Sequence, residues 1–278
     1  MPPPGQPMFP PPPAGIYEYT QILGFKFSDP SIPASLSDET TEIGKIWAAT
    51  MRTYLELEQT GIVWWALVHG DTSKAKLIVD WKTAAGREQF EASSQFQELS
   101  SAWQTVTSTP VSNNAYVFTH NSPGRQAGFA SQSGTVSALF TFRFNTPPSA
   151  SDKEQLDNTF LQFYNTILKS PGGVVSTVGI LGWEASLTSY CLAFRYLNIE
   201  TMQSFLEEDD KARGLAEGLQ SYATGGTELE FLETRVYKEG WQGSVDRTKP
   251  VDPNAGRWLA DVEERKTLGI NPLPTHMR

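Results

Sequence analysis

The stretch "GIVWWALVHGDTSKAKLIVDW", residues Gly61 to Trp81, decides the fold that the sequence predicts. Its first part, Gly61 to Gly70, is a mostly apolar run rich in β-branched and aromatic residues, which is typical of a buried strand. Asp71-Thr72-Ser73 has the composition of a turn, and Lys76 to Trp81 has that of a second strand. We therefore expect a two-stranded hairpin here.

The segments around this hairpin complete one structural unit. They predict a strand from Thr20 to Phe27, a helix from an N-cap at Ser37 to about Glu58, a helix from Ala84 to Val106, and a strand from Ala115 to His120. The order β-α-β-β-α-β is the split βαβ arrangement of ferredoxin-like folds.

The same order of elements returns after residue 135. The sequence predicts a strand from Ser137 to Phe144, a helix that begins with a capping box at Ser151 and Glu154, a hairpin formed by Val174 to Trp183 and Tyr190 to Tyr196, a helix from Thr201 to Tyr222, and a strand from Glu228 to Tyr237.

Matching positions in the two units keep a nearly constant separation. Phe25 lies 117 residues before Phe142 (142 − 25), Gly61 lies 112 before Gly173 (173 − 61), and Trp81 lies 115 before Tyr196 (196 − 81). Such offsets indicate one duplicated unit. We expect a disordered proline-rich tail over 1–15, one unit over 16–121, a linker over 122–135, a second unit over 136–238 and a C-terminal extension over 239–278.

Composition limits the class of partner and the compartment. The 278 residues carry a net charge of −9, which argues against binding to a nucleic-acid backbone. The single cysteine, Cys191, excludes an internal disulfide framework and fits a reducing compartment. No apolar run approaches the roughly 18 residues of a membrane span, and the first residues lack the pattern of a secretory signal. We expect a cytoplasmic protein that binds neither nucleic acid nor membrane.

The titratable residues do not form a recognisable catalytic or metal motif. Of the three histidines, His69 and His120 stand at predicted strand ends, where each could serve as a general base or simply be half-buried. No spacing of histidine, cysteine or carboxylates predicts a metal site, and no glycine-rich loop precedes a helix to cradle a nucleotide. Cys191 lies in a predicted buried strand, which favours inert packing.

Aromatic residues are the most suggestive group. Trp64, Trp65, Trp81 and Trp183 gather on the two hairpins, where they could line an apolar pocket for a flat ligand or could simply form the core. One pair of charges is also informative. Asp80 and Arg195 hold the same place in the two units (195 − 80 = 115), on the strand face opposite Trp81 and Tyr196. Because a buried charge needs a partner, we expect Asp80 to pair with a cation, with Lys26, Arg143 and Arg195 as candidates.

Both halves resemble the dimeric α/β barrel superfamily, in particular its antibiotic-biosynthesis-monooxygenase type. The resemblance rests on "KLIVDW" with Trp81 at its end, on the following "REQFEASSQFQELSSAW", and on the weaker echo from Tyr190 to Leu206. It implies an α+β fold in which tandem ferredoxin-like units form an intramolecular dimeric α/β barrel, with a possible pocket between sheet and helices. Leu77 stands where the cofactor-free oxygenases of this type have an asparagine.

The resemblance implies a function as well as a fold. We expect an enzyme of secondary metabolism that converts a hydrophobic aromatic or polyketide-like molecule without metal or nucleotide cofactor, as a monooxygenase or a cyclase. Trp81, Trp64, Trp65 and Tyr196 would contact the substrate, while His69, His120 or Tyr116 would handle protons.

Other interpretations stay open. The barrel could be a non-catalytic ligand-binding or structural protein whose pockets are filled by side chains. The proline-rich tail could recruit a partner, and the fused pair could assemble further as a homo-oligomer.

Overall fold

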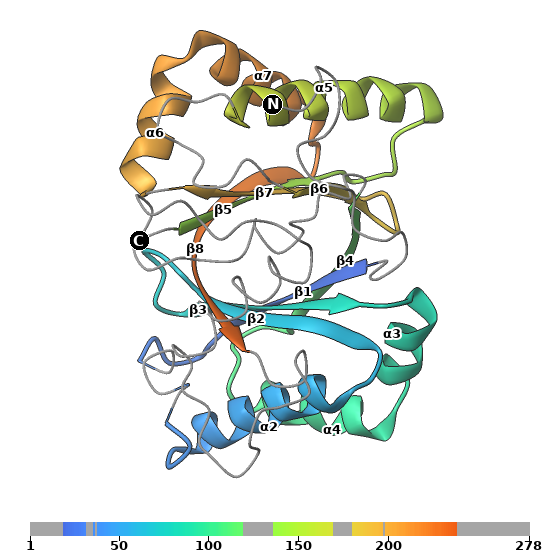
Figure 1. Cartoon of the computed structure of the whole chain (residues 1–278), viewed down its shortest axis with the longest axis vertical. Coiled ribbons are helices and arrows are strands. Elements are labelled where there is room, and N and C mark those ends of the chain that lie inside the picture. The colour runs from blue at the N-terminus through green and yellow to red at the C-terminus, as the bar shows by residue number, and fades with distance from the viewer. Residues whose placement is uncertain are drawn as a thin grey trace, which may run out of the picture.

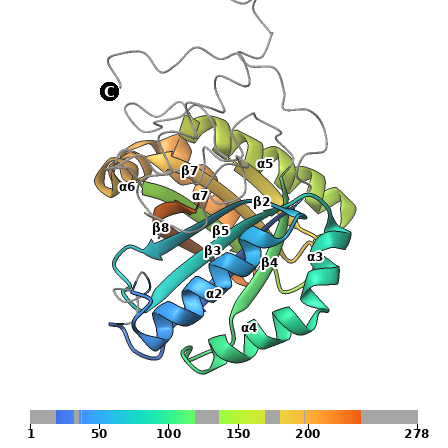
Figure 2. The same cartoon turned by 60° about the horizontal axis from the view of Figure 1, so that its bottom comes forward.

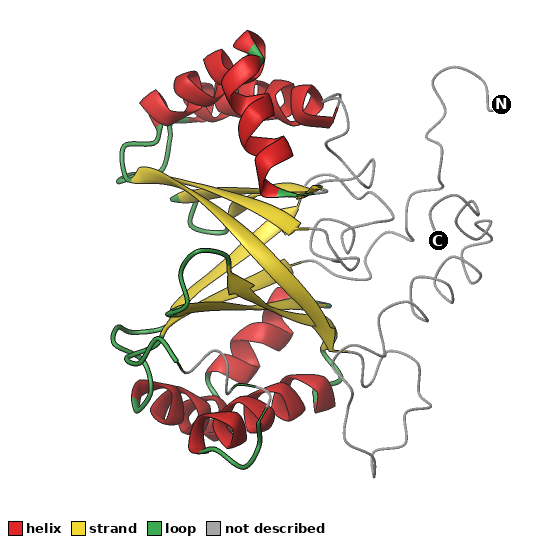
Figure 3. Ribbon diagram, turned by 90° about the vertical axis from the view of Figure 1, so that its left-hand side faces the viewer, coloured by secondary structure: helices red, strands yellow, loops and turns green. Residues whose placement is uncertain are grey.

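The structure, a computed structural model, describes residues 19–31, 36, 38–118, 136–168, 180–196 and 198–237. Within them, eight strands form one closed barrel in the order β1-β3-β2-β8-β5-β7-β6-β4. The barrel lies between two layers of helices, which cover it from opposite sides (Figure 1, Figure 3).

The described part of the N-terminal unit contains four strands and three helices. Their bounds are β1 Tyr19–Lys26, α2 Glu42–Glu56, β2 Thr60–Val68, β3 Lys74–Trp81, α3 Ala84–Glu91, α4 Ser94–Gln104 and β4 Ser112–Phe118. The three helices lie together on one face of the four strands (Figure 2).

The C-terminal unit repeats this order of elements. Its bounds are β5 Val136–Arg143, α5 Ala150–Leu168, β6 Ile180–Glu184, β7 Ser189–Tyr196, α6 Ile199–Glu208, α7 Asp210–Tyr222 and β8 Gly226–Tyr237. Both units place their strands in the spatial order fourth, first, third, second, as the predicted split βαβ arrangement requires.

Two seams between the units close the barrel. Strand β2 pairs with β8 over six residue pairs, and β4 pairs with β6 over three, from Tyr116↔Glu184 to Phe118↔Gly182. Among the described residues, every strand has a paired neighbour on both sides, which limits the usual site of strand-to-strand aggregation.

Alternation along the strands separates three hydrophobic clusters. One lies between the N-terminal sheet and α2, α3 and α4, and a second lies between the C-terminal sheet and α5, α6 and α7. The third faces the barrel interior and joins residues of both units, among them Ile22, Trp64 and Leu139. The predicted α+β fold, with two ferredoxin-like units whose sheets face each other, is confirmed.

Strand register fixes which residues of the two units correspond. Tyr19 pairs with Trp81 in one unit and Val136 pairs with Tyr196 in the other, so Trp81 and Tyr196 are equivalent, as predicted. Gly173 lies outside the described residues. The pairs Trp64↔Ile78 and Ile180↔Ala193 give the described parts of β2 and β6 an offset of 116 (180 − 64), and the predicted offset of 112 between Gly61 and Gly173 stays a prediction.

Side-chain caps place several helix boundaries differently from the prediction. Helix α2 begins after Thr41, whose side chain accepts from the Gly44 N–H, rather than after Ser37. In the first turn of α5, the Asp152 N–H donates a hydrogen bond to the side chain of Ser149 rather than to that of Ser151. Ser93 and Asp209 each cap a new helix and so divide the two long predicted helices into α3 and α4, and α6 and α7.

Within the described residues, no helix combines the length and the apolar character that crossing a membrane requires.

Candidate functional site between the sheet and helices of the N-terminal unit

The structure distributes the predicted site residues over different faces of the barrel. Trp81 and Trp65 face the helices of the N-terminal unit, and Tyr196 faces the helices of the C-terminal unit. Trp64 and Tyr116 face the barrel interior. One pocket therefore cannot use Trp81 together with Trp64, Tyr116 or Tyr196 without crossing a sheet.

The predicted histidines do not join these aromatic residues. His69 is exposed and follows the end of β2, whereas Trp81 pairs with Thr60 at the beginning of β2. The strand between them spans about 25 Å at roughly 3.3 Å per residue. His120 lies outside the described residues.

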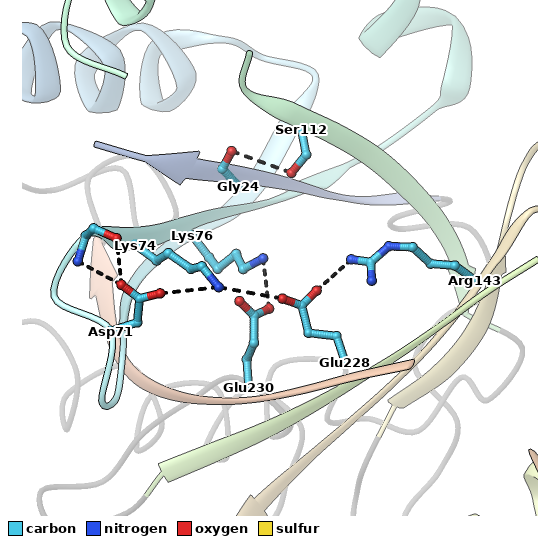
Figure 4. A network of polar contacts seen from close by, with 9 residues as sticks. Gly24, Asp71, Lys74, Lys76, Ser112, Arg143, Glu228 and Glu230 are labelled. Carbon is cyan, nitrogen blue, oxygen red and sulfur yellow. Dashed lines mark hydrogen bonds and ion pairs between the residues drawn. The ribbon is translucent and has the colours of Figure 1, made fainter. Parts of the chain in front are cut away.

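Ion pairs cross the barrel interior between the two units (Figure 4). Lys76 Nζ on β3 lies 2.8 Å from Glu230 Oε2 on β8, and both side chains are largely buried. Lys74 Nζ lies 3.8 Å from a Glu228 oxygen, and Arg143 donates to the other Glu228 oxygen at 2.6 Å. Because β2 separates β3 from β8 in the sheet, the two lysine contacts cross the interior side of β2 and join the N-terminal unit to the C-terminal unit, whereas Arg143 and Glu228 lie on paired strands of the C-terminal unit.

The network sets the protonation state of Glu228. Burial acts to raise the pKa of this carboxyl, but the Arg143 hydrogen bond and the charges of Lys76, Arg143 and Lys74 outweigh burial and hold the pKa below its ordinary value of 4.5. Glu228 is therefore ionised at neutral pH and bridges cations from both units.

Other polar residues of the interior are also hydrogen-bonded. The Tyr116 hydroxyl lies 3.0 Å from Ser189 Oγ, and Thr20 donates to Asp80 at 2.5 Å. Asp80 is buried on the interior face, as predicted. Of its predicted cations, Arg143 pairs with Glu228, Lys26 lies at the opposite end of β1, and the Arg195 side chain lies outside the described part, so the Asp80 ion pair stays a prediction.

Cys191 is fully buried in the same interior, and burial raises the pKa of its thiol, which agrees with the predicted inert packing.

Three aromatic rings form a buried cluster on the helix-facing side of the N-terminal sheet. The Tyr54 ring centroid lies 6.1 Å from that of Trp81 and 5.2 Å from that of Phe90, and Trp81 and Phe90 are 5.7 Å apart. They come from α2, β3 and α3, so the cluster exists only when both helices dock on the sheet. Edge-to-face contacts at these distances stabilise such clusters.

A polar group holds the Trp81 ring in place. Gln21 on β1 accepts from the Trp81 indole N–H at 2.9 Å. Its amide nitrogen donates to Glu91 Oε1 and to Asn113 Oδ1, both at 2.8 Å, and Asn113 donates to the same Glu91 oxygen at 2.8 Å. Arg87 Nε lies 3.8 Å from the other Glu91 oxygen. We call Gln21, Arg87, Glu91 and Asn113 the polar quartet.

The Tyr54 hydroxyl lies in this layer without a hydrogen-bond partner among the described residues, although Tyr54 is fully buried. Burial, and secondly the nearby charge of Glu91, raises the pKa of Tyr54 above its ordinary value of 10.0. The phenol therefore stays protonated at neutral pH and can donate to an oxygen of a bound molecule. Buried polar groups without a partner are rare and frequently mark a site that a ligand or water completes.

The corresponding layer of the C-terminal unit is packed with aromatic rings. Phe160 stacks parallel on Tyr190 with 3.6 Å between centroids, and Trp183 contacts Tyr190 edge to face at 4.9 Å. The Trp183 indole donates to Asp157 on α5 at 2.5 Å. The two layers thus differ in chemistry although their folds correspond.

Sequence reasoning identified Trp81 but missed its polar partners. Gln21 is a polar residue on the same strand face as Leu23 and Phe25, and a polar residue on a buried face is an informative signal. Arg87 and Glu91 have the i, i+4 spacing of a helical ion pair. Nothing in the sequence indicated that Tyr54 would lack a partner, because that depends on tertiary packing.

No protein-family model matches this sequence, and no curated protein matches it. Solved structures do match. An anthrone oxidase-like protein superposes with a TM-score of 0.54 at 12% identity, over 82% of this chain and 97% of the other. A candidate monooxygenase from Fusobacterium nucleatum superposes with a TM-score of 0.52 at 8% identity, over 81% of this chain and 95% of the other.

The chain has the dimeric α/β barrel fold. At such low identity these superpositions establish the fold alone. In this dimeric α/β barrel, one polypeptide provides both units. Among the described residues, no group of three or more histidine, cysteine or carboxylate side chains could hold a metal ion.

Proposed function

We propose that the N-terminal unit binds a hydrophobic aromatic small molecule between its sheet and helices and converts it in a monooxygenase- or cyclase-type reaction of secondary metabolism, without metal or nucleotide cofactor. The observation that carries this proposal is the buried Tyr54 hydroxyl, which lies beside Trp81 and Phe90 and finds no hydrogen-bond partner in the described part of the chain. The fold shared with an anthrone oxidase-like protein is consistent with it.

The chemistry of this layer suits an oxygen-bearing aromatic substrate. A neutral Tyr54 phenol can donate to a carbonyl oxygen and stabilise the negative charge that develops there when a proton leaves a ring carbon conjugated with that carbonyl, such as C10 of anthrone, which lies across the central ring from the C9 carbonyl. The Glu91 carboxylate is the group of the polar quartet that can accept a proton. Trp81, held by Gln21, provides a fixed aromatic wall.

Anthrone is a direct probe of this reaction, because one anthrone and one O₂ give one anthraquinone and one water. We expect purified protein to accelerate O₂ uptake and anthraquinone formation, measured with an oxygen electrode and by chromatography. Tyr54→Phe should reduce the rate by about 100- to 1,000-fold, the usual effect of removing one such donor. The His69→Ala variant should leave the rate unchanged, since His69 lies at the far end of the hairpin.

A non-catalytic barrel is the second candidate, and one observation favours it. Trp81, Tyr54 and Phe90 are buried and already contact one another, so the layer is well packed without a ligand. Two results would support this candidate and contradict the proposed enzymatic activity. The wild-type protein would leave the rate of anthrone oxidation at its uncatalysed value, and calorimetry would detect no binding of anthrone.

A further inference from the structure

The polar quartet has an apolar counterpart at every position of the C-terminal unit. Strand register equates Gln21 with Ala138 and Asn113 with Leu229. Helix α3 begins after the N-cap Thr83, and helix α6 begins after the N-cap Asn198. Their first residues are 115 positions apart in the sequence (199 − 84). Arg87 therefore corresponds to Met202 and Glu91 to Leu206, and both of these side chains pack in the C-terminal core.

This contrast shows that the fold does not require the quartet. The C-terminal unit builds the same strands and helices around apolar residues at the same four places, and it buries Met202 completely. Arg87 and Glu91 are 17% and 24% exposed, so placing a guanidinium and a carboxylate at these positions costs part of their desolvation energy. A ligand that needs these charges would account for them.

Arg87 is the member of the quartet whose hydrogen-bonding capacity is least used. Its side chain is 17% exposed, and its buried Nε–H has no hydrogen-bond partner among the described residues. The guanidinium carbon lies 5.9 Å from the centre of the Tyr19 ring. Glu91 is beyond hydrogen-bond distance at 3.8 Å, and its other oxygen already accepts from Gln21 and Asn113.

The position of Arg87 connects it to the aromatic layer. Tyr19, on which the guanidinium lies, is the register partner of Trp81 on the adjacent strand. A flat ring in this layer could thus place a substituent at the guanidinium. Arginine binds carboxylate oxygens through two parallel N–H bonds, and charge-assisted bonds of this kind are the strong ones.

We propose that Arg87 makes the N-terminal site selective for an aromatic molecule that carries an anionic oxygen, a carboxylate or a phenolate, which the guanidinium binds. This inference rests on the proposed function of the same layer as a small-molecule site. The C-terminal unit, with Met202 at this position, lacks the selectivity.

The test compares an anion with a neutral molecule of the same shape. Binding of 2-naphthoate and of 2-naphthamide to the full chain is measured by isothermal titration calorimetry at pH 7, with 4-nitro-1-naphthol as the phenolate probe. We expect 2-naphthoate to bind about tenfold more tightly than 2-naphthamide, the effect of one charge-assisted hydrogen bond. Comparison of 2-naphthoate with the nitronaphthol distinguishes carboxylate from phenolate.

Two variants locate the effect, and a third controls for net charge. Arg87→Met installs the residue of the C-terminal unit and should lower 2-naphthoate affinity about tenfold, to that of 2-naphthamide, without changing 2-naphthamide affinity. Arg87→Lys keeps the charge and should retain part of the preference. Arg52→Met removes an exposed arginine that pairs with Glu39 and should change neither affinity.

The outcomes separate this inference from the proposed function. Equal affinity of the wild-type protein for 2-naphthoate and 2-naphthamide, or an unchanged preference in Arg87→Met, overturns the charge selectivity and leaves the aromatic site in place. If neither naphthalene derivative binds, both the selectivity and the proposed site are wrong. Should Arg87→Met not fold, a full and unchanged preference for 2-naphthoate in Arg87→Lys would still contradict the role of the guanidinium fork.

Discussion

At the scale of single residues, the hydroxyls of two of the buried tyrosines, Tyr116 and Tyr54, differ in one respect. Tyr116 faces the barrel interior and its hydroxyl lies 3.0 Å from Ser189 Oγ. Tyr54 faces the helices and its hydroxyl has no partner among the described residues. A buried hydroxyl without a partner costs about 1–3 kcal/mol, which a protein tolerates where function uses the group.

This difference predicts opposite effects of the same substitution. Tyr116→Phe should lower the free energy of unfolding by about 1 kcal/mol, because it removes a satisfied hydrogen bond. Tyr54→Phe should leave it unchanged or raise it by about 1 kcal/mol, because it removes a desolvated hydroxyl. Urea unfolding of both variants checks this, and a clear loss of stability in Tyr54→Phe would mean that the hydroxyl has a structural partner.

At the scale of elements, the break between α3 and α4 shapes the candidate site. Ser93 accepts from the Phe96 N–H at 3.2 Å and so begins α4 directly after α3 ends. The break lets Phe90 on α3 and Trp103 on α4 both pack on the sheet. A single straight helix over the same residues, as the spacing of apolar residues predicted, would present a different face at one of its ends.

Removal of this cap should weaken the element measurably. Ser93→Ala should lower the free energy of unfolding by about 1 kcal/mol, as for other N-cap serines. The matched control is Ser101→Ala on the exposed face of α4, which should be neutral or slightly stabilising because alanine favours helix. Equal effects of the two substitutions in thermal unfolding would exclude a capping role for Ser93.

At the scale of the whole molecule, ion pairs across the interior couple the two units. Glu228 and Glu230 on β8 meet Lys74 and Lys76 on β3, and Glu228 also accepts from Arg143 inside the C-terminal unit, so protonation of Glu228 weakens one contact between the units and one within a unit. The pKa of Glu228 is held below 4.5 in the folded protein. A group with a depressed pKa stabilises the fold above its unfolded pKa, and the contribution disappears as pH falls through the folded value.

The resulting pH dependence has a definite sign. Glu228→Gln should be less stable than the wild type at pH 7, and the difference should shrink as pH falls below about 4.5. Urea unfolding between pH 7 and pH 3 measures this. Glu42→Gln, which removes an exposed carboxylate paired with Lys45, should show little difference at any pH. A difference for Glu228→Gln that persists unchanged at pH 3 would contradict the ionic origin.

The buried pair Lys76 and Glu230 permits a double-mutant cycle. Either single change, Lys76→Met or Glu230→Leu, should cost about 3–5 kcal/mol because it leaves a buried charge alone, whereas the double variant should be much closer to the wild type. Cys191 occupies the position equivalent to Lys76 in the other unit (191 − 76 = 115), so an uncharged residue is compatible with the strand there.

Additive losses in denaturant unfolding would show that the two side chains do not interact.

The sequence by itself determined the units, their order of elements and the equivalence of Trp81 with Tyr196, because strand alternation and helical spacing are local and are written directly in the order of residues. Only the tertiary structure decided which side chains share a site. It placed Tyr116 and Trp64 in the interior, brought Tyr54 and Gln21 to Trp81, and brought Arg87 to Tyr19 on the strand beside Trp81. These residues come from separate elements, and a hydrogen bond or its absence depends on distances that no local pattern encodes.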